Sequence, residues 1–208
     1  MEKLKFAITT FIVLLLFSGC DKEFLEKSPP DALTEDGFYN SAERAQLGVN
    51  AIYVALQGSW SENLMRINDV PSGDLVLSNT TPLEYNNYTY YPALTQIHST
   101  YSGLYQGIIR SNAVIKNVPG INMTDALKNQ YVGEAKFLRA LNYFTLTNLF
   151  GAVPLITEPL ENTDAALVAR TPVADITKVI IADLVSAEAG LPVSFSGNNL
   201  GRATKGAA

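Results

Sequence analysis

The sequence predicts an all-α protein of stacked helix pairs, and three observations support this fold class. Four segments carry apolar residues at the spacing of one helix face. Alternation with the period of a strand extends over no useful length, and only residues 76–77 and 153–156 look strand-like. The 208 residues, 47% of them hydrophobic, are enough for one domain with a substantial core.

The first helix is expected over residues 41–57. Asn40 can cap its N-terminus, with Glu43 three residues later, and Gly58 suits its end. Because its apolar residues recur at helical spacing, they predict one buried face, which consists of Ala45, Val49, Ile52, Tyr53 and Leu56.

Three further helices are expected over residues 99–117, over residues 124–150, and from about residue 171 to Gly190. The third of the four has the most sustained apolar stripe. For the last, we expect Thr171 as the N-cap and Pro172 at the first helical position, where a missing N–H leaves no hydrogen bond unmade.

Residues 60–97 fit no regular element and are expected to form a long irregular loop. Loops of this length are uncommon in a domain unless they are functional or disordered. This one combines aromatic rings, on which sugar faces can stack, with amides that can bond to sugar hydroxyls. The candidate ligand-binding residues are Trp60, Tyr85, Asn86, Asn87, Tyr88, Tyr90 and Tyr91. The alternative is that the aromatic side chains only fix the loop to the helices.

The charged residues of this segment and of the third helix have simpler interpretations. Asp69, Asp74 and Glu84 lie near one another in the sequence, but nothing in it fixes the paired carboxylates that a glycoside hydrolase requires, so we expect no enzymatic activity. The acidic and basic residues of the third helix, Glu134, Lys136 and Arg139, are expected to be solvated or paired within that helix.

The overall composition excludes several classes of function. Nucleic-acid binders need a basic face, whereas 15 Lys and Arg against 20 Asp and Glu give this chain a net charge of −5. A single Cys and a single His exclude a disulfide framework and Cys- or His-based metal clusters. We therefore expect no nucleic-acid partner, no metal site and no cofactor.

The N-terminus has the pattern of a secretory signal. Two lysines precede an apolar run, residues 6–17, which is too short for the roughly 20 residues that span a bilayer as a helix. Ser18-Gly19 then supply the small residues of a cleavage site directly before Cys20. This order is that of a bacterial lipoprotein, so we predict a signal peptide over residues 1–19 and lipid attachment at Cys20. An ordinary signal followed by an incidental Cys is the alternative.

Several short motifs follow the lipoprotein-like start in a specific order. They are Asp36-Gly37-Phe38-Tyr39, Leu104-Tyr105-Gln106-Gly107, Gly133-Glu134-Ala135-Lys136-Phe137-Leu138-Arg139-Ala140, Leu149-Phe150-Gly151-Ala152-Val153-Pro154-Leu155 and Gly201-Arg202-Ala203-Thr204-Lys205-Gly206. In this order and spacing they resemble the N-terminal half of the SusD/RagB family of outer-membrane lipoproteins.

The resemblance implies an architecture and a role. It implies tetratricopeptide-like helix pairs with long irregular loops, and a surface lid over a SusC-like TonB-dependent transporter that captures glycans or other nutrients. Family members are typically more than twice this length, so residues 20–208 are expected to be a SusD-like N-terminal domain without its C-terminal half. A surface glycoside hydrolase and a purely structural lipoprotein are the alternatives.

Overall fold

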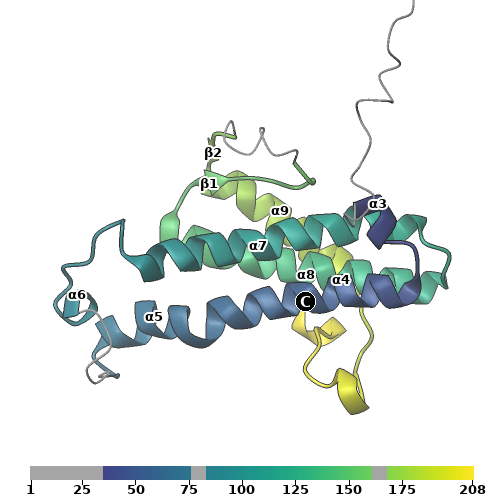
Figure 1. The fold of residues 1–208 in the computed structure, drawn as a ribbon, viewed down its shortest axis with the longest axis horizontal. Coiled ribbons are helices and arrows are strands. Elements are labelled where there is room, and N and C mark those ends of the chain that lie inside the picture. Colours follow the sequence, from purple (N-terminus) through teal and green to yellow (C-terminus); the bar gives the residue numbers. More distant parts are fainter. Residues whose placement is uncertain (1–34, 76–82, 161–167) are drawn as a thin grey trace, which may run out of the picture. The chain divides into compact units, whose positions relative to one another are not determined.

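The computed structural model describes residues 35–75, 83–160 and 168–208, and helices dominate all three segments (Figure 1). The prediction of an all-α fold is confirmed, since the described strands are a single pair of two residues each. The elements are α3 (Glu35–Phe38), α4 (Ala42–Gly58), α5 (Leu64–Ser72), α6 (Leu83–Asn86), α7 (Thr95–Asn117), α8 (Asp125–Phe150), β1 (Val153–Pro154), β2 (Arg170–Thr171) and α9 (Val173–Gly190).

The four expected helices correspond to α4, α7, α8 and α9, and α8 begins one residue after its predicted start because Thr124 is its N-cap. The Thr124 hydroxyl accepts a hydrogen bond from the Leu127 N–H at 3.4 Å. At α4 the predicted cap was wrong by one residue, because Ser41, not Asn40, accepts the N–H of Arg44. The Asn40 amide instead donates to the Gly37 carbonyl at 3.0 Å.

Helix α9 begins later than predicted. Thr171 pairs with Val153 in the antiparallel β1–β2 ladder, so it is the last residue of a strand and does not cap the helix. Pro172 is the N-cap, and the first helical residue is Val173. The strand pairing thus removes the residue that sequence spacing assigned to the cap.

The expectation of a wholly irregular segment over residues 60–97 was wrong. A π-helical turn, η1 (Ser59–Asn63), leads from α4 into α5, and in Figure 1 these elements follow one another along one line while α7 runs back beside them. α7 also starts earlier than expected, at Thr95. Gly73, at φ 84°, ends α5 in the left-handed conformation that glycine adopts most readily.

Helix α8 is the centre of the packing. It contacts α7 and α9, and α4 packs on both α7 and α8. Two apolar clusters fill the spaces between these helices. The first joins α4, α7 and α8 and consists of Ala45, Val49, Ile52, Val114, Val118, Ile121, Tyr131, Ala135 and Leu138. The second joins α7, α8, β1 and α9 and consists of Leu104, Ile108, Ala140, Tyr143, Leu146, Val153, Ile176 and Ile180.

The charged residues of α8 are placed differently from the prediction. Glu134 is fully buried and Arg139 is 6% exposed, and both form ion pairs with residues outside α8. Lys136 donates to the Ser186 hydroxyl of α9 at 2.7 Å. The prediction of a solvated or intrahelical set was wrong because the faces that carry these side chains are covered by α4, α9 and the C-terminal segment.

The predicted signal peptide, Cys20 and the strand-like residues 76–77 lie outside the described residues. Within the ranges that the structure describes, no helix is both long enough and apolar enough to cross a bilayer.

Candidate functional site

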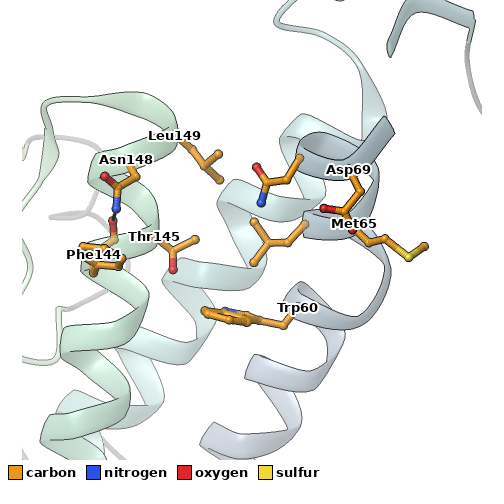
Figure 2. Close-up of a pocket in the computed structure, with 9 residues that line it drawn as sticks. Trp60, Met65, Asp69, Phe144, Thr145, Asn148 and Leu149 are labelled. Atoms are coloured by element: carbon orange, nitrogen blue, oxygen red, sulfur yellow. Dashed lines mark hydrogen bonds between the residues drawn. The ribbon is translucent and has the colours of Figure 1, made fainter. Parts of the chain in front are cut away.

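A cavity of about 350 Å³ opens between the η1–α5 segment and the C-terminal half of α8. Figure 2 shows Trp60, Met65 and Asp69 on one side, and α8 side chains opposite. Its volume lies in the range of small-molecule sites. The lining residues are Trp60, Leu64, Met65, Asn68, Asp69, Phe144, Thr145, Asn148 and Leu149.

The π-helical turn determines where Trp60 lies. The Leu64 N–H bonds to the Ser59 carbonyl, so the turn contains one residue more than an α-helical turn, a distortion that is frequent at functional sites. Ser59 is buried against α7, where a Cβ on Gly103 would lie only 2.5 Å from its hydroxyl oxygen. Trp60, the next residue, is 43% exposed and can offer a ring face to a ligand.

Several polar atoms of this cavity have no hydrogen-bond partner among the described residues. The Asn68 amide and the Asp69 carboxylate are exposed, and neither is hydrogen-bonded to another described residue. The Asn148 Nδ2 donates to the Phe144 carbonyl at 2.8 Å, which leaves its Oδ1 as an acceptor. Aromatic rings beside unpaired amide and carboxylate groups suit a ligand that is both apolar-faced and rich in hydroxyls.

A second cavity of about 280 Å³ adjoins the first. The two share Asn68, Asn148 and Leu149. Its remaining lining residues are Ile67, Tyr85, Tyr90, Ile97 and Phe150. The Tyr85 and Tyr90 rings are stacked, with centroids 6.0 Å apart and planes inclined by 27°.

Tyr85 forms the floor of this second cavity. It is 1% exposed, and it packs in a small apolar cluster with Val70 and Leu94. Burial raises the pKa of its hydroxyl, and the charge of Arg66 opposes that shift. The hydroxyl has no hydrogen-bond partner among the described residues.

The predicted ligand-binding residues divide into two groups. Trp60, Tyr85 and Tyr90 line the two cavities, and the structure brings them to one side of the helices. The other four are exposed and line neither cavity: Asn86, Asn87, Tyr88 and Tyr91. Tyr88 has a positive φ of 55°, and its hydroxyl donates to the Pro71 carbonyl.

Sequence reasoning did not assign the α8 side of the site. Phe144 is 56% exposed, although it lies in α8, the longest of the described helices. The available signal was that Phe144 falls outside the apolar stripe of that helix, so its ring had to face something other than the core.

Asp69 is the only carboxylate among the described residues that line the two cavities. Asp74 and Glu84 line neither one. Glycoside hydrolases generally need two carboxylates across the scissile bond. Among the described residues, no three His, Cys, Asp or Glu side chains lie close enough together to hold a metal ion.

A further cavity, of about 510 Å³, lies beside the polar cluster between α7, α8 and α9. The Arg139 guanidinium in its wall is bound bidentately by Asp183 and also donates to Asn112. The most buried charges of this cavity are therefore paired within the fold.

Comparison with known proteins identifies the family. A family model described as starch-binding and associating with the outer membrane matches residues 23–208. SusD-like protein P38 of Formosa agariphila is 30% identical over 94% of this chain, and a SusD-like protein of Bacteroides ovatus is 26% identical over 93%. The chain spans 40% and 36% of the length of these two relatives.

Solved structures of SusD-like proteins are also similar to this chain. A laminarin-binding SusD-like protein is 29% identical, with a TM-score of 0.69 over 81% of this chain and 38% of its own. A SusD superfamily protein of Parabacteroides distasonis is 28% identical, also with a TM-score of 0.69, over 79% of this chain and 37% of its own. Because the family model covers nearly the whole sequence, this chain belongs to the SusD-like family.

Proposed function

We propose that this chain is the carbohydrate-binding N-terminal part of a lipid-anchored outer-membrane protein that works with a SusC-like TonB-dependent transporter in nutrient uptake. The observation that supports the binding function is the Trp60 cavity, where an exposed indole ring lies near the Asn68 amide and the Asp69 carboxylate, neither of which is hydrogen-bonded to another described residue. Sugar rings have apolar C–H faces that stack on aromatic rings, and their hydroxyls pair with such polar groups. The family description and the names of similar proteins favour the same function.

The binding function is tested by affinity gel electrophoresis of the chain in gels that contain laminarin, starch, xylan or mannan. We expect at least one polysaccharide to retard the protein, and Trp60→Ala to abolish that retardation. Tyr91→Ala is the matched control, because Tyr91 is similarly exposed, at 51%, but lines neither cavity. If Trp60→Ala migrates like the unaltered protein in every gel, the Trp60 cavity is not the binding site.

The anchor is proposed from Cys20, which directly follows the small residues of the predicted cleavage site. Two or more acyl chains hold a protein durably at a membrane. We expect labelled palmitate to enter the protein in its bacterial host, and Cys20→Ser to prevent both labelling and recovery with the outer membrane. Unchanged fractionation of Cys20→Ser would contradict the anchor.

The transporter partnership is proposed from the family resemblance. Affinity purification of the tagged chain from solubilised outer membranes is expected to recover a large β-barrel protein. The Trp60→Ala variant should recover the same amount, since it alters the ligand cavity alone. Absence of any barrel from both purifications would contradict the partnership while leaving the carbohydrate test unaffected.

A further inference from the structure

Each of the two adjoining cavities is lined by an exposed aromatic ring. Trp60 lies in the first cavity and Tyr90 in the second, and Asn68 and Asn148 line both. We infer that the cavities form one groove that binds an uncharged oligosaccharide, with one sugar ring on Trp60 and a later ring on Tyr90. This inference rests on the proposed carbohydrate-binding function and specifies its ligand.

Tyr90 is held in place before any ligand arrives. Its ring is stacked on Tyr85, which is itself buried, while Tyr90 remains 49% exposed. Because the Tyr90 ring is already fixed by Tyr85, it loses little conformational freedom when a sugar stacks on it. More of the contact energy therefore contributes to affinity. Trp60 is held similarly, because the π-helical turn that carries it packs against α7.

The shared amides suit the sugar hydroxyls between the two rings. The Asn68 side chain has no partner among the described residues, and the Asn148 Oδ1 is an available acceptor. An amide offers both donors and an acceptor, so it can satisfy hydroxyls of either orientation. Both amides are exposed, so a ligand can reach them without opening the core.

The charge of the groove selects against acidic sugars. Asp69 lines it, whereas none of its described lining residues is Lys, Arg or His. Arg66, whose charge acts on Tyr85, is not among the lining residues. A uronate or sulfate group would meet the Asp69 carboxylate and no cation among the described lining residues, in a chain whose net charge is already −5.

The charge selectivity is tested by isothermal titration calorimetry with laminarin, starch, xylan and mannan, each compared with its carboxymethylated derivative. We expect the neutral form to bind at least about fivefold more tightly, as for like charges a few ångströms apart near water. Asp69→Asn should narrow that ratio, and raised salt should narrow it further. Glu188→Gln is the control, since it removes an equal charge from an exposed site on α9 outside the groove.

The second platform is tested with the neutral polysaccharide that binds best. Tyr90→Ala should weaken binding by about tenfold, because a stacked aromatic ring accounts for roughly one power of ten in affinity. Tyr90→Phe should retain the affinity, because the ring face is kept. Tyr91→Ala should bind like the unaltered protein, since its neighbouring ring lines neither cavity.

The outcomes separate this inference from the function on which it rests. Tighter binding of the carboxymethylated forms would overturn the selection for uncharged polysaccharides. The same conclusion would follow if Asp69→Asn and Glu188→Gln had equal ratios of affinity for the neutral and the carboxymethylated form. Equal affinities of Tyr90→Ala and Tyr91→Ala would overturn the second platform. In these cases carbohydrate binding itself still stands. If no polysaccharide of either set binds, the proposed function fails and the inference fails with it.

Discussion

Arg139 of α8 and Asp183 of α9 form a buried bidentate ion pair. The guanidinium Nε and Nη2 donate to the two carboxylate oxygens, each at 2.7 Å, and the residues are 6% and 5% exposed. Arg139 Nη1 also donates to the Asn112 Oδ1 at 2.8 Å and to the Thr157 carbonyl at 2.9 Å. One guanidinium therefore joins α7, α8, α9 and the segment after β1.

Removal of one partner of this pair should destabilise the protein strongly. Arg139→Met leaves the Asp183 carboxylate buried without its cation, and such changes lower the free energy of unfolding by about 3–5 kcal/mol. The double variant Arg139→Met, Asp183→Leu removes both charges, so it should recover a large part of that loss. Urea denaturation followed by circular dichroism measures both values.

The matched control for the ion pair is Lys178→Met. Lys178 pairs with Asp175 at 2.7 Å, but both side chains are exposed, so solvent screens the pair. We expect no measurable change in the urea midpoint. A double variant less stable than Arg139→Met would show that the pair is not the source of the loss.

Glu134 holds the segment that follows α9. Its Oε2 accepts from the Tyr53 hydroxyl and from Arg202 Nη1, each at 2.9 Å, and the Tyr53 hydroxyl accepts the Ala203 N–H at 2.9 Å. Glu134→Gln removes the charge that binds Arg202. We expect faster hydrogen exchange at the Ala203 amide, measured by mass spectrometry of peptides that cover residues 200–208.

The exchange measurement contains its own control. Peptides from the middle of α7, near Ile108, should keep their protection, because their amides depend on helix packing and not on Glu134. Equal acceleration in α7 would indicate global destabilisation, which contradicts a local role for Glu134. Glu188→Gln should leave both regions unchanged.

The main helices were predictable because their buried faces are long and periodic. The range predicted for the third helix, residues 124–150, differs from α8 by one residue at its start and ends at the same residue, and Gly151, which follows it, has a φ of 70°. Helix α5 was missed because Leu64 and Val70 are its only buried residues, and Pro71 in its last turn reads as a helix breaker.

Half of the candidate site was predictable for a different reason. Trp60 and Tyr90 were recognisable as aromatic residues in a polar segment, whereas nothing in the sequence paired them with Asn148 of α8. Periodicity gives the buried face of a helix but not the element opposite it. Similarly, the partners of Arg139 and Glu134 lie 44 and 68 residues away, which sequence spacing within one helix cannot reveal.

Close contact between α8 and α9 depends on Gly190. A Cβ there would lie 2.6 Å from the Asn129 carbonyl oxygen, and a backbone atom cannot move aside as a flexible side chain can. We therefore expect Gly190→Ala to lower the free energy of unfolding by about 1–3 kcal/mol, as overpacking does. Urea denaturation measures this value.

Gly58→Ala is the matched control for Gly190→Ala. Gly58 also ends a helix, α4, but a Cβ there would meet no atom within 4 Å. The substitution should stabilise the protein by about 0.4–1 kcal/mol, because alanine restricts the unfolded chain. Equal effects of the two substitutions would contradict the close contact.

The Tyr143 hydroxyl links α8 to the segment after β1. It donates to the Ile156 carbonyl at 2.9 Å and accepts the Ile156 N–H at 2.7 Å. Burial raises the pKa of Tyr143 from 10.0 to about 12, and the hydrogen bond from the Ile156 N–H opposes the shift. Burial also raises the pKa of Tyr53 and of Tyr105.

These raised values make the fold sensitive to alkali. Above pH 10 the unfolded chain loses tyrosine protons that the folded chain retains, so the stabilisation, complete below pH 10, is lost as pH rises toward 12. At pH 7, Tyr143→Phe should be about 1–3 kcal/mol less stable than the unaltered protein, because it leaves the buried Ile156 N–H without its acceptor, whereas the Ile156 carbonyl still accepts from the Asn112 amide. Between pH 10 and pH 12 the difference should narrow, because the variant has one fewer proton to lose.

Urea midpoints at pH 8, 10 and 11 measure this narrowing. Tyr91→Phe is the control, because Tyr91 is exposed and its hydroxyl holds no buried group. The urea midpoint of Tyr91→Phe should equal that of the unaltered protein at every pH. The urea midpoints of Tyr143→Phe and the unaltered protein could instead differ by the same amount from pH 8 to pH 11. That result would mean that burial does not raise the pKa of Tyr143.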